Sequence, residues 1–127
     1  MTFDNAISWF EIPALDMPRA TKFYETIFEM SMIPFNTDGF KMSMFPVENM
    51  QTSIGGCLIE SSEHVPSATD GPLIYLNASP DLQIVLDKIE EAGGKVQLPK
   101  TMISEEYGFM AVFLDTEGNR IALHSGS

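Results

Sequence analysis

The pattern of apolar and polar residues in the first half of the chain predicts one strand, one helix and three further strands. The segment Ile7–Ile12 is rich in aromatic and β-branched residues, which favour extended backbone. Asp16 stands at the position of a helix N-cap, with Pro18 in the first turn. Behind this cap, residues at helical spacing form one apolar stripe: Ala20, Phe23, Tyr24, Ile27 and Phe28. Three shorter segments predict strands: Met32–Phe35, Phe40–Phe45 and Ile54–Ile59.

The second half of the chain repeats this order after a polar segment, residues 61–71, which has the composition of a linker. We predict a strand at Leu73–Asn77, then a helix that begins after an N-cap at Ser79 and ends at Gly93. The next three predicted strands are residues 95–98, 109–114 and 120–124. The charged segment Pro99–Gly108 is expected to be a long loop, of a length compatible with a lid over a site.

The repeated order of strand, helix and three strands predicts an α+β fold built from two βαβββ modules. Module 1 spans about residues 1–62, the linker about 61–71 and module 2 about 72–127, within a single domain of residues 1–127. One module of about 55 residues buries too little surface to be stable alone. We therefore expect the two modules to share a core and to leave a cleft of mixed sheets between them.

The composition and charge of the chain argue against some classes of binding partner and favour one cellular compartment. The chain carries 18 acidic and 7 basic residues, a net charge of −11, which opposes binding to nucleic acid or to an anionic membrane surface. The single cysteine, Cys57, cannot form an internal disulfide or a cysteine-based zinc site, which favours the reducing cytoplasm. The first residues lack the basic and apolar regions of a signal peptide.

Three short motifs in the expected order resemble the vicinal oxygen chelate superfamily, which includes glyoxalase I, bleomycin-resistance proteins and extradiol dioxygenases. The first is the opening strand and helix start at residues 9–24, with the pattern D-x-x-R-A-x-x-F-Y. The second is A-G-G-K-V at residues 92–96, and the third is D-T-E-G-N-R-I at residues 115–121. This resemblance implies the paired βαβββ fold and a homodimer. It does not by itself imply an activity, since function depends on the site that the fold carries.

The resemblance also implies one divalent ion in the cleft, held by His, Gln or Glu from the first and last strands of each module. The matching positions here are Trp9, Ala122 and Leu73, or Tyr75 if the register differs by two. The fourth position is Cys57, Leu58 or Glu60. Indole is only a donor, and leucine and alanine have no ligating atom. We therefore expect no metal ion and no other cofactor at this site.

Alternation of side chains along strands places a set of candidate ligand-binding residues in the cleft. They are Trp9, Glu11, Tyr75, Asn77 and His124. Trp9 is either a stacking platform for a planar ligand or part of the core. Glu11 is either paired structurally, with His124, Lys41 or Arg120, or a ligand contact or general base. Glu11 and His124 are the candidate catalytic residues, whereas His64, in the linker, is expected to be solvated.

These observations favour a metal-free protein that binds a small apolar or aromatic molecule and is a homodimer. Whether it is an enzyme stays open at this point. The first alternative is a metal-dependent lyase or isomerase resembling glyoxalase I. The second is a non-catalytic, dimeric interaction module. Measurements of metal content and of ligand binding distinguish these three hypotheses.

Overall fold

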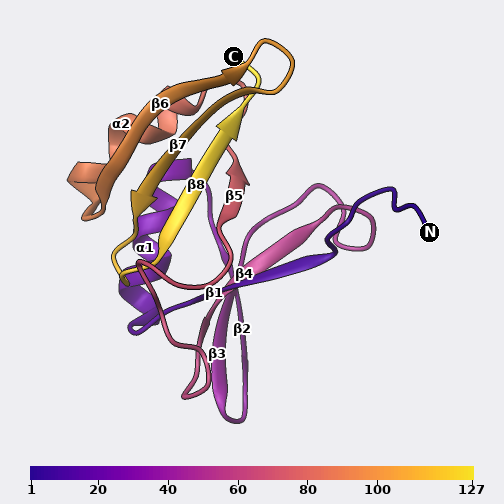
Figure 1. Cartoon of the computed structure of the whole chain (residues 1–127). Helices are drawn as coiled ribbons and strands as arrows, with labels where there is room; N and C mark the ends of the chain where they lie inside the picture. The colour runs from indigo at the N-terminus through magenta and orange to yellow at the C-terminus, as the bar shows by residue number, and fades with distance from the viewer.

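The computed structural model describes all residues, 1–127, and shows two modules of four strands and one helix each (Figure 1). The elements of module 1 are β1 (Trp9–Pro13), α1 (Met17–Phe28), β2 (Ile33–Thr37), β3 (Phe40–Met44) and β4 (Gly55–Glu60). Those of module 2 are β5 (Ile74–Asn77), α2 (Leu82–Ala92), β6 (Lys95–Ser104), β7 (Gly108–Leu114) and β8 (Arg120–Ser125). The sheet orders are β1-β4-β3-β2 and β5-β8-β7-β6, with the first and last strands of each module parallel. The predicted α+β fold of two βαβββ modules is confirmed.

The two helices begin at carboxylate caps. The side chain of Asp16 accepts a hydrogen bond from the Arg19 backbone nitrogen at 3.1 Å, as predicted. For α2, however, the predicted N-cap at Ser79 is wrong, because the Asp81 side chain accepts from the Gln83 backbone nitrogen at 2.9 Å. Asp81 stands directly before the apolar stripe, so its carboxylate meets the first free N–H groups. The predicted end of α2 is correct, since Gly93 is the C-cap with φ of 108°.

The segment expected to be a long loop, Pro99–Gly108, is mostly strand. Strand β6 continues to Ser104 and pairs with β7 along its length, with three shifts of register. Because β6 lies at the edge of its sheet, Pro99 costs no hydrogen bond to a further strand. Only the short turn between Ser104 and Gly108 remains as a connection, so the expected long loop is corrected to a hairpin.

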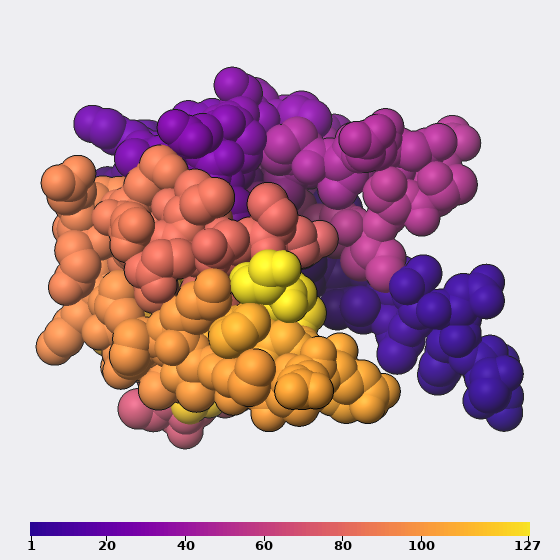
Figure 2. Space-filling model, turned by 90° about the horizontal axis from the view of Figure 1, so that it is seen from above, coloured from indigo at the N-terminus to yellow at the C-terminus, as the bar shows by residue number.

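The two modules share one hydrophobic core between the helix-covered faces of their sheets. Helices α1 and α2 pack on each other, and the backbones of the strands in one sheet do not come close to those in the other. The space-filling view shows the purple and orange modules side by side, with the N-terminal residues projecting from the body (Figure 2). Neither helix is long enough and apolar enough to cross a membrane. The largest side chains buried in the core are Tyr24, Phe23, Phe113, Ile12 and Ile27.

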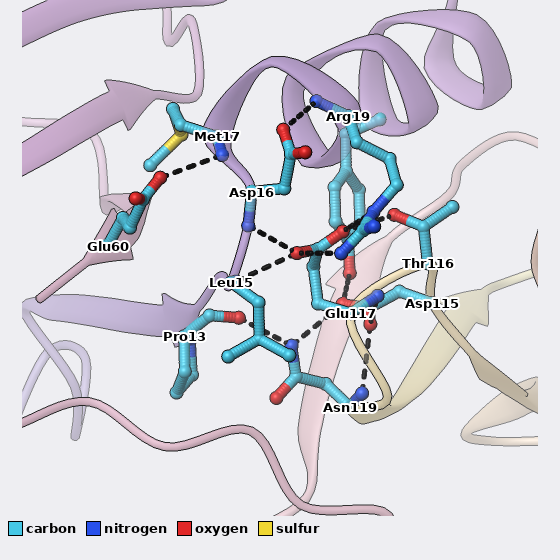
Figure 3. Close-up of polar contacts among 11 residues, drawn as sticks. Pro13, Leu15, Asp16, Met17, Arg19, Glu60, Asp115, Thr116, Glu117 and Asn119 are labelled. Carbon is cyan, nitrogen blue, oxygen red and sulfur yellow. Dashed lines mark hydrogen bonds and ion pairs between the residues drawn. The ribbon is translucent and has the colours of Figure 1, made fainter. Parts of the chain in front are cut away.

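A polar cluster joins the turn between β7 and β8 to the N-terminus of α1 (Figure 3). The side chain of Glu117 is fully buried, and its Oε1 accepts from the backbone nitrogens of Leu15 and Asp16, each at 2.8 Å. Arg19 donates to Oε2 from Nε at 2.8 Å and to Oε1 from Nη2 at 3.0 Å. Burial opposes the charge, but the guanidinium and the N–H groups outweigh it and lower the pKa of Glu117. Glu117 therefore holds module 2 against module 1 as a charged group.

The same cluster continues through Asp115 into the core. Asp115 accepts from the Tyr24 hydroxyl at 2.8 Å and from the Asn119 side chain at 2.9 Å. The Asn119 side chain also donates to the carbonyl of Pro13 at 2.7 Å, which ties β1 to module 2. Burial raises the pKa of Asp115, and burial together with the charge of Asp115 raises the pKa of Tyr24. The first and third family motifs thus meet here and hold the two modules together.

Candidate functional site

Trp9 and Glu11 lie on the outer face of the module 1 sheet, the face turned away from the shared core. Alternation along β1 sends Phe10 and Ile12 towards that core, and Ile12 is 1% exposed. Trp9 is 38% exposed, and a Cβ built on Gly55, its neighbour on β4, would come within 3.4 Å of the indole. The indole therefore lies close over a glycine while much of it stays open to a ligand.

The register of β4 resolves the ambiguous fourth position of the family's metal site. Cys57 lies opposite Glu11 in the parallel pair and shares the outer face with it, whereas Leu58 belongs to the core. Glu60 is not on the outer face, because its Oε1 accepts from the Met17 backbone nitrogen at 2.8 Å. Burial, helped by the negative charge of Glu11, raises the pKa of Cys57 to about 12. In the absence of a metal ion, Cys57 is therefore a protonated thiol at neutral pH.

The module 2 residues of the candidate set lie on the outer face of the second sheet. Tyr75 is 50% exposed and pairs with Ala122, while Asn77 pairs with His124. Nε2 of His124 lies 2.6 Å from the Tyr107 carbonyl oxygen. A carbonyl oxygen can only accept, so Nε2 carries the proton and Nδ1 is free to accept in the neutral ring. His124 therefore offers an acceptor to a ligand on this face.

Two predictions for Glu11 and His64 are corrected. Glu11 does not pair with His124, Lys41 or Arg120; its Oε1 lies 3.1 Å from Nε2 of His64. His64 is in turn 2.7 Å from the hydroxyl of Ser61 through Nδ1, so it is not simply a solvated linker residue. The chain turns back after β4, where the His64 N–H donates to the Ser61 carbonyl, and this turn carries the imidazole over β1. No periodic pattern in the linker signalled this contact.

The residues at the family's metal positions do not fit a divalent ion. Three of the four positions supply no ligating atom, since they hold Trp9, Ala122 and Leu73, and only the fourth, Cys57, carries a group that could ligate. Tyr75, the alternative to Leu73, directs its hydroxyl to the sulfur of Met110 at 4.0 Å. No group of three or more His, Cys, Asp or Glu side chains is placed to hold a metal anywhere in the structure. These positions therefore carry aromatic and apolar side chains where the family resemblance implies a set of metal ligands.

Within one chain the two halves of the candidate site remain separate. Trp9 and Glu11 belong to module 1, and Tyr75, Asn77 and His124 belong to module 2, without a hydrogen bond between the halves. The sheets that carry them share the core behind them, and they also border one hollow, which Glu11 lines together with Ile74 and Arg120. Each half is thus an open face with an exposed aromatic side chain.

Comparison with known proteins places the chain in a family. The sequence profile of the Glyoxalase/Bleomycin resistance protein/Dioxygenase superfamily matches residues 6–123. A Glyoxylase-like domain-containing protein from Didymella fabae is 30% identical over 129 residues, covering 97% of this chain and 95% of that protein. The chain belongs to this superfamily, as its three motifs indicated.

Solved structures share the fold at low sequence identity. A glyoxalase I variant from Zea mays, V278E, superposes with a TM-score of 0.73 at 16% identity, over 93% of this chain but only 45% of the maize chain. This chain thus spans about half the length of the maize enzyme. A glyoxalase/bleomycin resistance protein from Streptomyces has a TM-score of 0.68 at 20% identity, with 92% and 97% of the two chains covered. The trypanothione-dependent glyoxalase I of Leishmania major has a TM-score of 0.68 at 14% identity, over 97% and 88%.

Proposed function

We propose that this protein is a metal-free member of the superfamily that binds a small planar apolar or aromatic molecule on the outer faces of its sheets. The observation that carries the proposal is the half-open indole of Trp9 at a position where the family resemblance implies a metal ligand. An aromatic face beside a glycine supports a stacked ring and cannot hold a cation by coordination.

The polar groups beside the aromatic side chains define what the ligand must offer. The carboxylate of Glu11 and Nδ1 of His124 are acceptors, so they favour a ligand that carries N–H or O–H groups. The side-chain oxygen of Asn77 accepts from the Ser79 backbone at 3.0 Å, which leaves its amide N–H groups as donors. Where the two faces come together, a planar ring with two hydrogen-bond donors, for Glu11 and His124, and one acceptor, for Asn77, would match these groups. Tyr75 would give this ring a second aromatic surface.

If the protein binds such a ligand, removing the carboxylate of Glu11 should weaken the affinity for the ligand without changing the fold. Trp9 is the only tryptophan, so a ligand stacked on it should quench the intrinsic fluorescence of the protein. Screening aromatic compounds that carry N–H or O–H groups, phenols and indoles first, should yield a saturable quench. For such a compound, Glu11→Gln should weaken binding by about tenfold, because a charged hydrogen bond becomes a neutral one.

The matched control for this experiment is Glu90→Gln. It removes an exposed carboxylate on helix α2, which does not belong to either outer sheet face. It should leave the affinity unchanged. Equal affinity in Glu11→Gln and the wild type would contradict the assignment of Glu11. Failure of every aromatic compound to quench Trp9 would contradict the role of the indole.

The separate halves of the site lead us to propose a homodimer, in which module 1 of one copy faces module 2 of its partner. Support comes from the maize chain, which is long enough to contain two equivalents of this chain. The outer face of module 1 also carries exposed apolar side chains beyond Trp9, such as Ile33 and Phe35. Burying these side chains against a second copy would stabilise the pair and close the cleft.

Sedimentation should show a species of twice the 14.1 kDa chain mass at micromolar concentration. Phe35→Glu should shift it towards the monomer, since a charge would then be buried in an apolar contact. Ile84→Glu, on the exposed surface of α2, is the control and should leave the mass unchanged. A monomeric wild type, or a dimer indifferent to Phe35→Glu, would count against this pairing.

A further inference from the structure

A chain of three side chains crosses the rim of the module 1 sheet and is not explained by the family fold or by the binding role. The hydroxyl of Ser61 lies 2.7 Å from Nδ1 of His64, and Nε2 of His64 lies 3.1 Å from Oε1 of Glu11. Ser61 and His64 come from the turn after β4, and Glu11 comes from β1. The three groups therefore meet through tertiary structure, in the order hydroxyl, imidazole, carboxylate.

The hydrogen-bonding capacity of the three groups determines where each proton lies. An ionised carboxylate can only accept, so Nε2 of neutral His64 carries the proton and donates to Glu11. Nδ1 is then the unprotonated nitrogen, and the Ser61 hydroxyl must donate to it. In this arrangement the imidazole can act as a base towards Ser61, and the carboxylate fixes the tautomer of the imidazole. The same arrangement of base and carboxylate activates serine nucleophiles in enzymes.

The Ser61 oxygen keeps the capacity to attack an electrophile. Its proton points to His64, and one lone pair accepts from the Glu63 backbone nitrogen at 3.2 Å. A second lone pair remains free. The Glu63 N–H therefore fixes the orientation of the Ser61 oxygen and leaves that lone pair available for attack.

The chain opens onto a hollow that suits a small apolar group. The hollow has a volume of about 420 Å³, and its apolar wall is formed by Phe40, Met42 and Ile59. The side chains of His64 and Glu11 are 30% and 39% exposed, so a ligand in the hollow can reach them while water can also enter. The hollow therefore adjoins both the candidate nucleophile, Ser61, and its base, His64.

We propose that Ser61 is an acyl-accepting nucleophile towards small activated esters, with His64 as its base and Glu11 as the positioning residue. The Ser61 oxygen bonds to the acyl carbon while its proton passes to Nδ1 of His64. The bond from the acyl carbon to the ester oxygen breaks, and the alcohol leaves with that proton. Water then attacks the acyl-serine, returns a proton through Nδ1 and releases the acid, which restores the Ser61 hydroxyl.

This activity is independent of the proposed ligand-binding function, although Glu11 takes part in both. The aromatic ligand is expected on Trp9, and Ser61 is not among the groups that contact it. Ser61→Ala should therefore abolish acylation and keep the quenching of Trp9 by ligand, so the two proposals can fail separately.

The test uses two probes on the intact protein. A fluorophosphonate should modify one serine, and peptide mass spectrometry should place the label on Ser61. With p-nitrophenyl acetate, the wild type should release nitrophenolate at least about tenfold faster than Ser61→Ala or His64→Gln. Ser62→Ala removes the adjacent hydroxyl, which makes no hydrogen bond to a histidine, and should keep both label and rate.

Several outcomes would overturn the proposal. They are a label on Ser62 or on a histidine, equal rates in Ser61→Ala and the wild type, or no label at all on a protein with an unchanged melting temperature. If Ser61→Ala fails to fold, Ser61→Cys decides the matter, since a thiol there should be acetylated by the same ester faster than buried Cys57. Equal acetylation of the two thiols would contradict an activated position at residue 61.

Discussion

Replacing Glu117 by alanine is expected to lower the free energy of unfolding by about 3 kcal/mol. The substitution removes the acceptor of the Leu15 and Asp16 backbone N–H groups and the partner of Arg19. Glu117 lies in module 2 and these partners lie in module 1, so the loss falls on the contact between the modules. Chemical denaturation followed by circular dichroism measures the change.

Glu106→Ala is the control for Glu117→Ala, because it removes a carboxylate from the exposed turn between β6 and β7. It should change stability by less than about 0.5 kcal/mol. The lowered pKa of Glu117 adds a pH test with a definite sign. Its ionised form stabilises the protein at neutral pH, and this contribution disappears as the pH falls below the usual pKa of a glutamate and through the lowered pKa of Glu117.

The difference in stability between the wild type and Glu117→Gln should therefore be largest near pH 7 and shrink on acidification. Titrations common to both proteins, such as that of Asp115, cancel in this comparison. A difference that is constant with pH would show that the charge of Glu117 contributes nothing. A difference absent at pH 7 would contradict the structural role of the cluster.

Replacing Phe113 by alanine is expected to destabilise the protein by about 4 kcal/mol, through lost burial and the cavity that remains. Phe113 is fully buried on β7, and its ring lies 5.9 Å from that of Phe23 on α1, so it fills the core between the modules. Two closely packed helices and sheets leave little room for the site to collapse. Denaturant unfolding measures this loss as well.

Ile84→Ala is the matched control for Phe113→Ala, because it shortens a large apolar side chain on the exposed surface of α2. It should cost less than about 1 kcal/mol. A loss below about 1.5 kcal/mol in Phe113→Ala would mean that the modules are not joined by this core. Retained ligand quenching of Trp9 in the folded variant would show that the outer faces do not depend on it.

The fold could be predicted from the sequence because its elements carry strong periodic patterns. The stripe behind Asp16 predicts α1 and its cap correctly, since five apolar residues at helical spacing leave one orientation against a core. The errors arise where two local signals compete. Ser79 and Asp81 are both good caps, and only the position of Leu82 in the buried stripe selects Asp81. Charged residues after Pro99 suggested a loop, but an edge strand tolerates them.

The candidate site was predictable within each strand and not between segments. Alternation along β1 correctly puts Trp9 and Glu11 on one face, because a strand has only two faces. The partner of Glu11 was missed because a linker residue, His64, reaches it through a turn without sequence periodicity. In the same way, the link between Arg19 and Glu117 depends on how the two modules pack, which no local pattern encodes.

The central claim is that the Trp9 face binds an aromatic ligand without a metal ion, and one titration tests it most directly. The fluorescence of Trp9 is followed during addition of the ligand, on protein purified without chelator and again after exhaustive treatment with EDTA. We predict the same affinity in both preparations, because no group of three or more His, Cys, Asp or Glu side chains is placed to hold a metal ion. Loss of binding after EDTA, restored by one equivalent of Zn²⁺, Ni²⁺ or Mn²⁺, would contradict the claim and favour a metal-dependent glyoxalase-like enzyme.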